Sequence, residues 1–208
     1  MKEKNYTGII PEQQTGKAID AESSVELNNI EEAKTFFNVV KSRLQNVNKW
    51  HKFAGDISAV FKLLDKESVE VQRSAQKGDY IKIDIPGPGS DSGDGYDWVQ
   101  IEEVESTSVP DVDSFAFRVR PAQNPQNNKD DTAHFFSPES TSSFTVTREK
   151  KKVTAAIYDR NTKANKEVDS ITDKIRDAVV GTAGIIGFSK IQWKNLTDGL
   201  LSRENNNT

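Results

Sequence analysis

The chain has 208 residues, of which 34% are apolar and 29% charged, a balance that fits one domain with some length outside its core. Its 28 basic and 32 acidic residues give a formal net charge of −4, without the basic excess that binding a phosphate backbone requires, so nucleic acid is excluded as a first hypothesis. The chain contains no cysteine, which excludes disulfides, thiolate metal sites and a cysteine nucleophile.

Both ends of the chain are polar and show no periodicity. We expect flexible tails over residues 1–23 and 202–208, and a single α+β domain over residues 24–201. The N-terminus has no apolar run of signal-peptide length, and no apolar segment is long enough to span a membrane. Together with the lack of cysteine, this predicts a soluble cytoplasmic protein with no membrane partner.

The first regular element is predicted as a helix over about residues 30–49. Asn29 followed by Glu32 forms a capping-box pattern. Apolar residues then recur at helical spacing, at Phe36, Val40, Leu44 and Val47. The next run, residues 57–64, also has helical spacing, although it is short enough to form a strand instead.

From Ser68 onward the apolar period changes to two, which is typical of half-buried antiparallel strands. Six segments show this alternation: SVEVQRSA, DYIKIDI, DWVQIEEV, SFAFRVR, SFTVTRE and VTAAIYD. The charged EKKK between the last two predicts a hairpin with its tip in water. We therefore expect a curved antiparallel sheet of about six strands.

A glycine-rich loop, PGPGSDSGDG, interrupts the predicted strands. In the overlapping DSGDGYDWVQIE, the acidic residues Asp91, Asp97 and Glu102 match places one, seven and twelve of a calcium loop. Places three and five are Gly93 and Gly95, which bring no side-chain oxygen. We therefore predict a flexible hairpin loop and no metal site.

A second loop, PAQNPQNNKDDTAHFFSPEST, ends in the aromatic cluster His134, Phe135 and Phe136. A loop of about 20 residues is long for a compact domain, so it is expected to fold over something or to be functional. We favour the interpretation that this loop covers the core. The alternative is that one phenylalanine stays exposed and anchors a partner.

Another aromatic cluster, Trp50, His51 and Phe53, lies in NKWHKFAGD. The simpler interpretation is that Trp50 and Phe53 close one end of the core, with His51 at the rim. The alternative is an aromatic mouth of a pocket, where His51 is the polar group that fixes a ligand.

The last apolar segment predicts one long helix from Ile171 to Leu200, with an apolar stripe at 3-4 spacing. Four residues stand out on the opposite face: Gly181, Gly184, Gly187 and Phe188. Each glycine costs a helix interior roughly 0.5–1 kcal/mol relative to alanine. Three explanations stay open: another segment of the chain crosses this face closely, a partner docks there, or the helix breaks at the glycines.

Sequence motifs for catalysis or cofactor binding are missing: the chain has no phosphate-binding loop, no G-x-S-x-G elbow and no H-E-x-x-H. Its two histidines, His51 and His134, do not lie at metal-ligand spacing from another ligand. We expect no cofactor and no metal, and rank an enzyme below a non-catalytic protein. If a site assembled in space exists, its first candidate carboxylates are Asp84, Glu102 and Glu103.

The order of elements, helices first, then consecutive antiparallel strands, then one long amphipathic helix, indicates an α+β fold with the last helix across the sheet. This order is similar to the helix-grip arrangement of START-like and polyketide-cyclase-like ligand carriers. SVEL is a candidate for their first strand, and NKWHKF resembles their tryptophan-bearing turn. The resemblance implies a closing helix that covers a cavity.

Two functions remain. The first is a non-catalytic protein-interaction or assembly component, with a protein partner or a second copy of the chain bound at the last helix. The second is a carrier of a small apolar ligand in a START-like cavity between the sheet and that helix. The candidate ligand- or partner-binding residues are Trp50, His51, Phe53, His134, Phe135, Phe136, Gly181, Gly184, Gly187 and Phe188.

Overall fold

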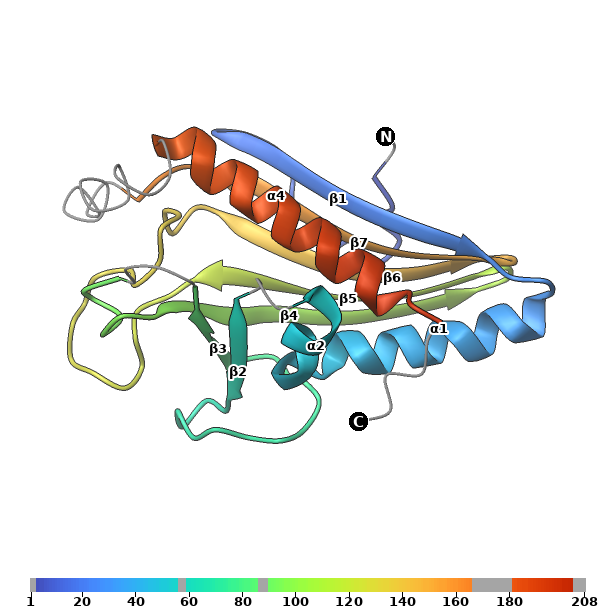
Figure 1. The fold of residues 1–208 in the computed structure, drawn as a ribbon, viewed down its shortest axis with the longest axis horizontal. Helices are drawn as coiled ribbons and strands as arrows, with labels where there is room; N and C mark the ends of the chain where they lie inside the picture. Colours follow the sequence, from blue (N-terminus) through green and yellow to red (C-terminus); the bar gives the residue numbers. More distant parts are fainter. Residues whose placement is uncertain (1–2, 56–58, 86–89, 166–180, 204–208) are drawn as a thin grey trace.

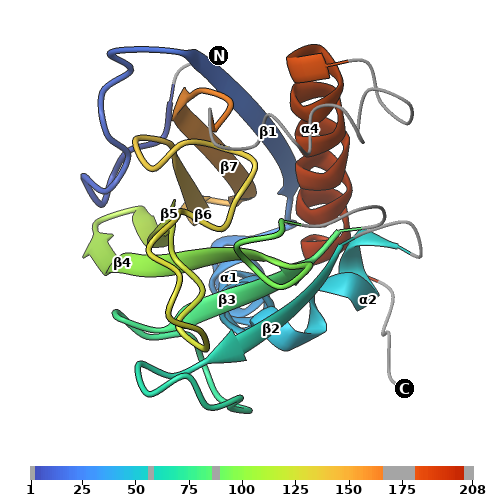
Figure 2. The same ribbon diagram turned by 90° about the vertical axis from the view of Figure 1, so that its left-hand side faces the viewer.

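The computed structural model describes residues 3–55, 59–85, 90–165 and 181–203, with side chains in the last of these ranges from residue 186 onward. Seven strands form one antiparallel sheet, in the order β1-β7-β6-β5-β4-β3-β2. Figure 1 shows α1 and α4 running beside the long strands, and Figure 2 shows the sheet curving around α4. The predicted α+β class, with a last helix packed across an antiparallel sheet, is confirmed, and the arrangement is of the helix-grip kind.

In chain order, the elements are β1 (Lys17–Glu26), α1 (Ile30–Gln45), a 3-10 turn (Val47–Lys49), α2 (Trp50–Ala54), β2 (Val60–Leu64), β3 (Tyr80–Asp84), β4 (Asp97–Val109), β5 (Val112–Pro121), β6 (Thr141–Glu149), β7 (Lys152–Thr162) and α4 (Gly181–Leu200). Within the described residues, no helix is both long and apolar enough to cross a membrane.

Helix α1 begins where the capping pattern places it. The side chain of Asn29 accepts a hydrogen bond of 2.8 Å from the backbone N–H of Glu32, which satisfies one of the free donors of the first turn. The buried stripe of α1 is Ala33, Phe37, Val40 and Leu44. The regular helix ends at Gln45 and continues as the 3-10 turn, so the predicted limit at residue 49 includes both.

Five of the six predicted strands form β3 to β7, and EKKK lies at the β6–β7 hairpin. The helical interpretation of residues 57–64 is wrong where the structure describes them, because β2 occupies Val60–Leu64. In β2 Phe61 and Leu63 are buried while Val60 and Lys62 are exposed, which is the period of a strand.

SVEVQRSA is not a strand, although Glu70 forms an isolated bridge with Leu64. The carboxylate of Asp65 accepts hydrogen bonds from the backbone N–H groups of Glu67 and Val69, at 3.0 and 2.9 Å. Such local side-chain bonds compete with a strand ladder. They turn the chain directly after β2.

The expectation of a flexible tail over residues 1–23 is corrected where these residues are described, because β1 begins at Lys17. Ile9 and Ile10 are buried with Ala156 and Tyr158 on the outer face of the sheet. Asn5 closes this segment by hydrogen bonds with the backbone N–H and C=O of Ile10, at 3.1 and 3.0 Å. At the other end, Ser202 and Arg203 follow α4, and residues 204–208 lie outside the described residues.

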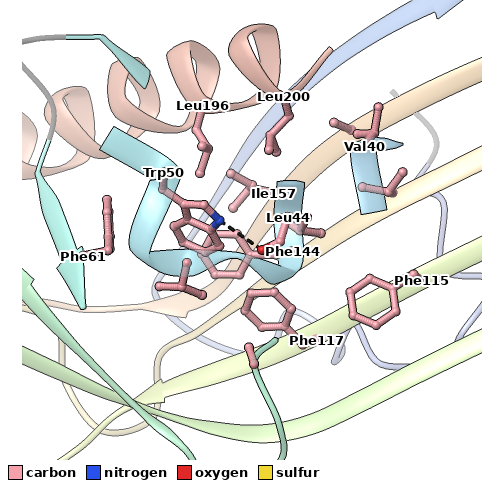
Figure 3. Close-up of a cluster of buried hydrophobic side chains, with 14 of the residues drawn as sticks. Val40, Leu44, Trp50, Phe61, Phe115, Phe117, Phe144, Ile157, Leu196 and Leu200 are labelled. Atoms are coloured by element: carbon pink, nitrogen blue, oxygen red, sulfur yellow. Dashed lines mark hydrogen bonds between the residues drawn. The ribbon is translucent and has the colours of Figure 1, made fainter. Parts of the chain in front are cut away.

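The main core lies between the helices and the inner face of the sheet, the face that carries Phe115, Phe117, Phe144 and Ile157. Trp50 stands at its centre (Figure 3). Its ring lies 4.9 Å from Phe144 and 5.1 Å from Phe61, between centroids. The indole Nε1 donates to the carbonyl of Leu44 at 3.0 Å. Buried aromatic groups contribute much of the energy of a core, so this cluster fixes α2 to the sheet.

Helix α4 runs without a break from Gly181 through Gly184 and Gly187, while the predicted first turns over residues 171–180 lie outside the described residues. Its C-terminal half carries the inward stripe, where Leu196 and Leu200 are buried in the main core. The explanation of the glycines by a broken helix is therefore wrong within α4.

The C-terminal end of α4 is docked by polar contacts as well. The guanidinium of Arg43 donates to the carbonyl of Leu200, the last residue of α4, and to the carbonyl of Ser202 just beyond it, at 2.8 and 2.7 Å. A carbonyl in the last turn of a helix has no acceptor role within the helix itself. Gly199 packs directly on α2, because a Cβ atom at this residue would lie 1.9 Å from the carbonyl oxygen of Phe53. These contacts hold one end of α4 firmly against α1 and α2.

Candidate functional site

A cavity of about 50 Å³ lies between the inner face of the sheet and α4. Its walls come from α2, from β2 to β6, from the loop before β6 and from α4. The described lining residues are apolar except for four: His134, Ser142, Ser189 and Gln192. The site is thus an apolar space with a few polar groups, the usual composition of a small-molecule site.

Five of the ten predicted site residues line this cavity together: Trp50, His134, Phe135, Phe136 and Phe188. They come from three segments that lie far apart in the sequence, on α2, on the loop before β6 and on α4. Trp50 is fully buried in the core and also lines the cavity. Both interpretations of NKWHKF, as the closed end of the core and as part of a pocket, therefore apply to this residue.

Three other predicted site residues, His51, Phe53 and Gly187, are not among the described lining residues. His51 is half-buried. Phe53 packs on α4 at Gly199, with the guanidinium of Arg43 5.6 Å from the centre of its ring. At Gly187 a Cβ atom would have no neighbour within 4 Å. No described segment therefore crosses the glycine face there. What surrounds Gly181 and Gly184 beyond their helix lies outside the described residues.

The aromatic loop folds over the cavity and leaves neither phenylalanine exposed. Phe136 is buried and Phe135 is half-buried. The loop is held along the end of β7, where the backbone N–H of Asn165 donates to the carbonyl of Phe135 at 2.9 Å and Phe136 forms a bridge with Ala164. The preferred interpretation of this loop, a cover for the core, describes its position.

Two further groups fix this loop from inside. The buried carboxyl of Asp97 lies beside this loop. Burial raises the pKa of Asp97 to about 7, a rise that the backbone N–H of Phe135 reduces in part. The backbone N–H of Phe136 donates to Nδ1 of His134 at 2.9 Å. Because a neutral imidazole that accepts at Nδ1 carries its proton on Nε2, this bond sets the tautomer of His134. Burial lowers the pKa of His134 to about 3, so the ring is neutral at physiological pH.

Gln192 is a lining residue that the sequence analysis did not single out. It projects from α4 one turn after Phe188 and one turn before Leu196, and only 5% of it is exposed. Its Oε1 accepts a hydrogen bond of 3.2 Å from the backbone N–H of Ala59. Its Nε2 is buried and has no hydrogen-bond partner among the described residues. A polar residue at helical spacing between two apolar ones was the available signal.

Asp159 is a second group that the sequence analysis missed. It lies on β7 and is fully buried behind the cavity wall, where its Oδ2 accepts a hydrogen bond of 2.9 Å from Nε1 of the lining residue Trp193. Its Oδ1 has no hydrogen-bond partner in the part of the chain that the structure describes. Burial raises the pKa of Asp159 to about 7, a shift that the Ser142 hydroxyl and the Trp193 indole reduce only in part.

The carboxylates named as candidates for a spatially assembled site do not reach the cavity. Asp84 is exposed at the end of β3. Glu102 and Glu103 pair with the guanidinium of Arg118, at 2.9 and 3.0 Å. The described residues contain no group of three or more histidine or carboxylate side chains placed to hold a metal ion.

No family model matches the sequence, and no curated protein matches it either. Among solved structures, a hypothetical protein from Helicobacter pylori is similar, with 13% identity over 88% of this chain and 87% of its own and a TM-score of 0.46. A norcoclaurine synthase from Thalictrum flavum is 9% identical over 86% of this chain and 93% of its own, with a TM-score of 0.36. Major latex-like protein 151 from Panax ginseng is 12% identical over 90% of this chain and 100% of its own, with a TM-score of 0.35. At these levels the similarities indicate no particular ligand or activity.

Proposed function

We propose that the protein binds a small, largely apolar molecule in the cavity between the sheet and α4. The observation that carries this proposal is the cavity itself, whose wall combines two tryptophans, Trp50 and Trp193, with a few polar groups. Burial of apolar surface against such walls drives binding. A volume of about 50 Å³ is below the roughly 150 Å³ that holds benzene. A ring-sized ligand therefore needs its half-buried neighbours, Phe135 and Phe188, to move outward.

Binding fits this cavity better than catalysis. His134 is the histidine of the cavity wall, and its pKa of about 3 makes it a weak general base near neutral pH. The carboxyl of Asp159 is not among the described lining residues, and its Oδ2 is occupied by the indole of Trp193. We therefore rank a carrier or sensor of a small molecule above an enzyme.

The proposal is tested with α-methylstyrene as an apolar probe. The three indole N–H signals in a two-dimensional NMR spectrum report the outcome, because Trp50 and Trp193 line the cavity while Trp98 lies in a separate cluster with Leu64 and Ala133. Saturable shifts of the Trp50 and Trp193 signals, with the Trp98 signal unchanged, are expected. No shift at any accessible concentration, or equal shifts of all three signals, would contradict the proposal.

A matched pair of variants places the binding in the cavity. Val99 and Val109 both lie on β4, but Val99 lines the cavity while Val109 is 49% exposed. Val99→Phe fills the space and is expected to abolish binding of α-methylstyrene. Val109→Phe adds the same atoms outside and is expected to leave binding unchanged. Because overpacking destabilises cores, the NMR spectrum of Val99→Phe must first show a folded protein.

A second candidate function is self-association through α4. Ile191 is 64% exposed, and it follows the open Gly187 by one helical turn. An apolar side chain beside a bare stretch of helix can pack on a second copy. Light scattering over a concentration series, with wild type and Ile191→Asp, tests this candidate. A monomer throughout the series counts against it.

The cellular location of the protein and its relation to nucleic acid and membranes are also proposals. The chain without cysteine fits the reducing cytoplasm, where we place the protein. A net charge of −4 gives no attraction toward nucleic acid or an anionic membrane surface. We therefore propose neither as a partner.

A further inference from the structure

We infer that the cavity selects neutral ligands that carry an acceptor oxygen, such as a ketone, an ester or an amide, and that the side-chain amide of Gln192 donates a hydrogen bond to this oxygen. The inference rests on the proposed function, and it adds the chemical class of the ligand and the residue that recognises it.

The orientation of the Gln192 amide is fixed by its neighbour. The backbone N–H of Ala59 can only donate, so the atom that faces it at 3.2 Å is the amide oxygen. The NH₂ group must then occupy the other branch of the side chain. This group is buried and has no partner for a hydrogen bond within the described ranges of the chain, and Gln192 belongs to the cavity wall. A buried donor without a partner costs free energy, which an acceptor atom on a ligand would recover.

His134 supplies a second donor on the same cavity wall. Its Nδ1 is occupied by the backbone N–H of Phe136, so the ring proton resides on Nε2. We find no hydrogen bond from this Nε2 to any described residue. Gln192 and His134 come from different elements, α4 and the aromatic loop, and both contribute to the cavity wall. Gln192 and the neutral His134 are thus the lining residues with an amide or imidazole N–H that no described residue accepts from.

The charge of the cavity wall determines the charge of the ligand. No described lining residue carries a formal charge, because His134 is neutral and the others are apolar, hydroxyl or amide side chains. A carboxylate would lose its hydration there without a cation to pair with. A neutral carbonyl oxygen needs only the hydrogen bonds that the two donors offer. This favours ketones, esters and amides over the corresponding acids.

Acetophenone and α-methylstyrene form a matched pair of probes, since a carbonyl in the first replaces a C=CH₂ group in the second. Their dissociation constants are measured by the Trp50 and Trp193 indole signals for wild type and Gln192→Met, which has a similar length and no donor. Acetophenone is expected to bind about 3- to 10-fold more weakly to Gln192→Met, the range that one neutral hydrogen bond contributes. The affinity for α-methylstyrene is expected to stay the same or to rise. An unchanged ratio of the two affinities overturns the inference.

The design separates the two proposals. If α-methylstyrene fails to bind wild type, the proposed function fails. If α-methylstyrene binds wild type and Gln192→Met equally, and the affinity for acetophenone is also the same in both, only the inference fails. Binding of α-methylstyrene also shows that the variant is folded with an open cavity. If Gln192→Met does not fold, Gln192→Glu replaces it, because glutamate keeps an oxygen for the Ala59 N–H. Gln192→Glu is also expected to weaken the binding of acetophenone. Benzoate is expected not to bind wild type, and benzoate binding as tight as acetophenone binding overturns the inference.

Discussion

The indole Nε1 of Trp193, on α4, donates a hydrogen bond of 2.9 Å to the Oδ2 atom of Asp159, on β7. This bond joins the last helix to the sheet immediately behind the cavity wall. The other oxygen of Asp159 accepts no hydrogen bond from any residue that the structure describes, and Asp159 is fully buried. A buried carboxylate with so little compensation is costly in its charged form, which explains why its pKa rises to about 7.

Asp159 is expected to make the stability of the protein depend on pH. In the unfolded chain an aspartate has a pKa of about 3.9, so between pH 4 and 7 the folded protein holds a proton that the unfolded chain has released. The free energy of unfolding therefore falls as the pH rises through this window, by on the order of 4 kcal/mol for a shift of about three units. Asn at this position does not titrate. Urea unfolding at pH 4.5, 6 and 7.5 should show Asp159→Asn gaining stability relative to wild type as the pH rises.

The comparison with Asp159→Asn also removes the effect of other titrating groups. His134 changes stability with pH in the opposite direction. Because its pKa is lowered in the folded protein, the free energy of unfolding decreases as the pH falls from 6.5 toward 3. Asp97, whose pKa is also raised, changes stability with pH in the same direction as Asp159. Both groups are present in wild type and in the variant, so their contributions cancel in the difference. Parallel stability curves for the two proteins would contradict the assignment to Asp159.

Two glycines of α4 should respond in opposite ways to alanine. An added Cβ atom at Gly187 would meet nothing within 4 Å, so Gly187→Ala should stabilise the protein by up to about 1 kcal/mol through helix propensity. At Gly199 the same atom would lie 1.9 Å from the carbonyl oxygen of Phe53. Gly199→Ala should therefore destabilise by about 1–3 kcal/mol, because α4 must move away from α2. Chemical denaturation of both variants checks the prediction, and destabilisation by Gly187→Ala would mean that the glycine face is covered.

Periodicity predicted the elements whose side chains alternate between core and water. It identified α1, the strands β3 to β7 and the inward stripe of α4, because burial on one face leaves a regular pattern. It failed where local geometry decided the outcome. Asp65 turns the chain after β2, and the pair Ile9 and Ile10 packs on the outer face without any period. The close approach that requires a glycine occurs at Gly199, which no pattern in the sequence marked.

The cavity wall could be predicted only in part, for a related reason. Aromatic clusters are visible in a sequence, and they led to Trp50 and to the loop of His134, Phe135 and Phe136. Gln192 and Asp159 are buried polar residues that belong to no motif. Their importance depends on which groups face them, and that is set by packing between segments far apart in the chain. A sequence pattern carries no record of an unpaired donor or acceptor.

The N-terminal segment is expected to contribute to stability. Ile9 is 1% exposed and packs with Tyr158 on the outer face of the sheet. Ile9→Ala should lower the free energy of unfolding by about 2–4 kcal/mol, as deletion of buried methyl groups does. Ile30→Ala is the matched control, because Ile30 is 40% exposed and such positions usually change stability by less than about 1 kcal/mol. Equal effects of the two variants would indicate that residues before β1 do not hold their place in solution.

Trp50 links the stability of the core to the size of the cavity. Trp50→Phe keeps an aromatic ring among Phe61, Phe117 and Phe144, but it removes the hydrogen bond to the carbonyl of Leu44. We expect a loss of about 1–3 kcal/mol in the free energy of unfolding. The space left by the indole enlarges the cavity, so α-methylstyrene should bind about 3- to 10-fold more tightly, in line with the additional apolar contact.

Trp98→Phe is the control for this prediction. Trp98 is equally buried, and its Nε1 donates to the carbonyl of Gly93 at 3.3 Å, but it belongs to the separate cluster with Leu64 and Ala133. The substitution should destabilise the protein to a similar degree and leave the affinity for α-methylstyrene unchanged. If both variants change the affinity, loosening of the whole fold explains the effect. If only Trp50→Phe changes the affinity, the probe occupies the space beside Trp50. The two variants lose a similar amount of stability, but only Trp50→Phe changes a side chain that lines the cavity.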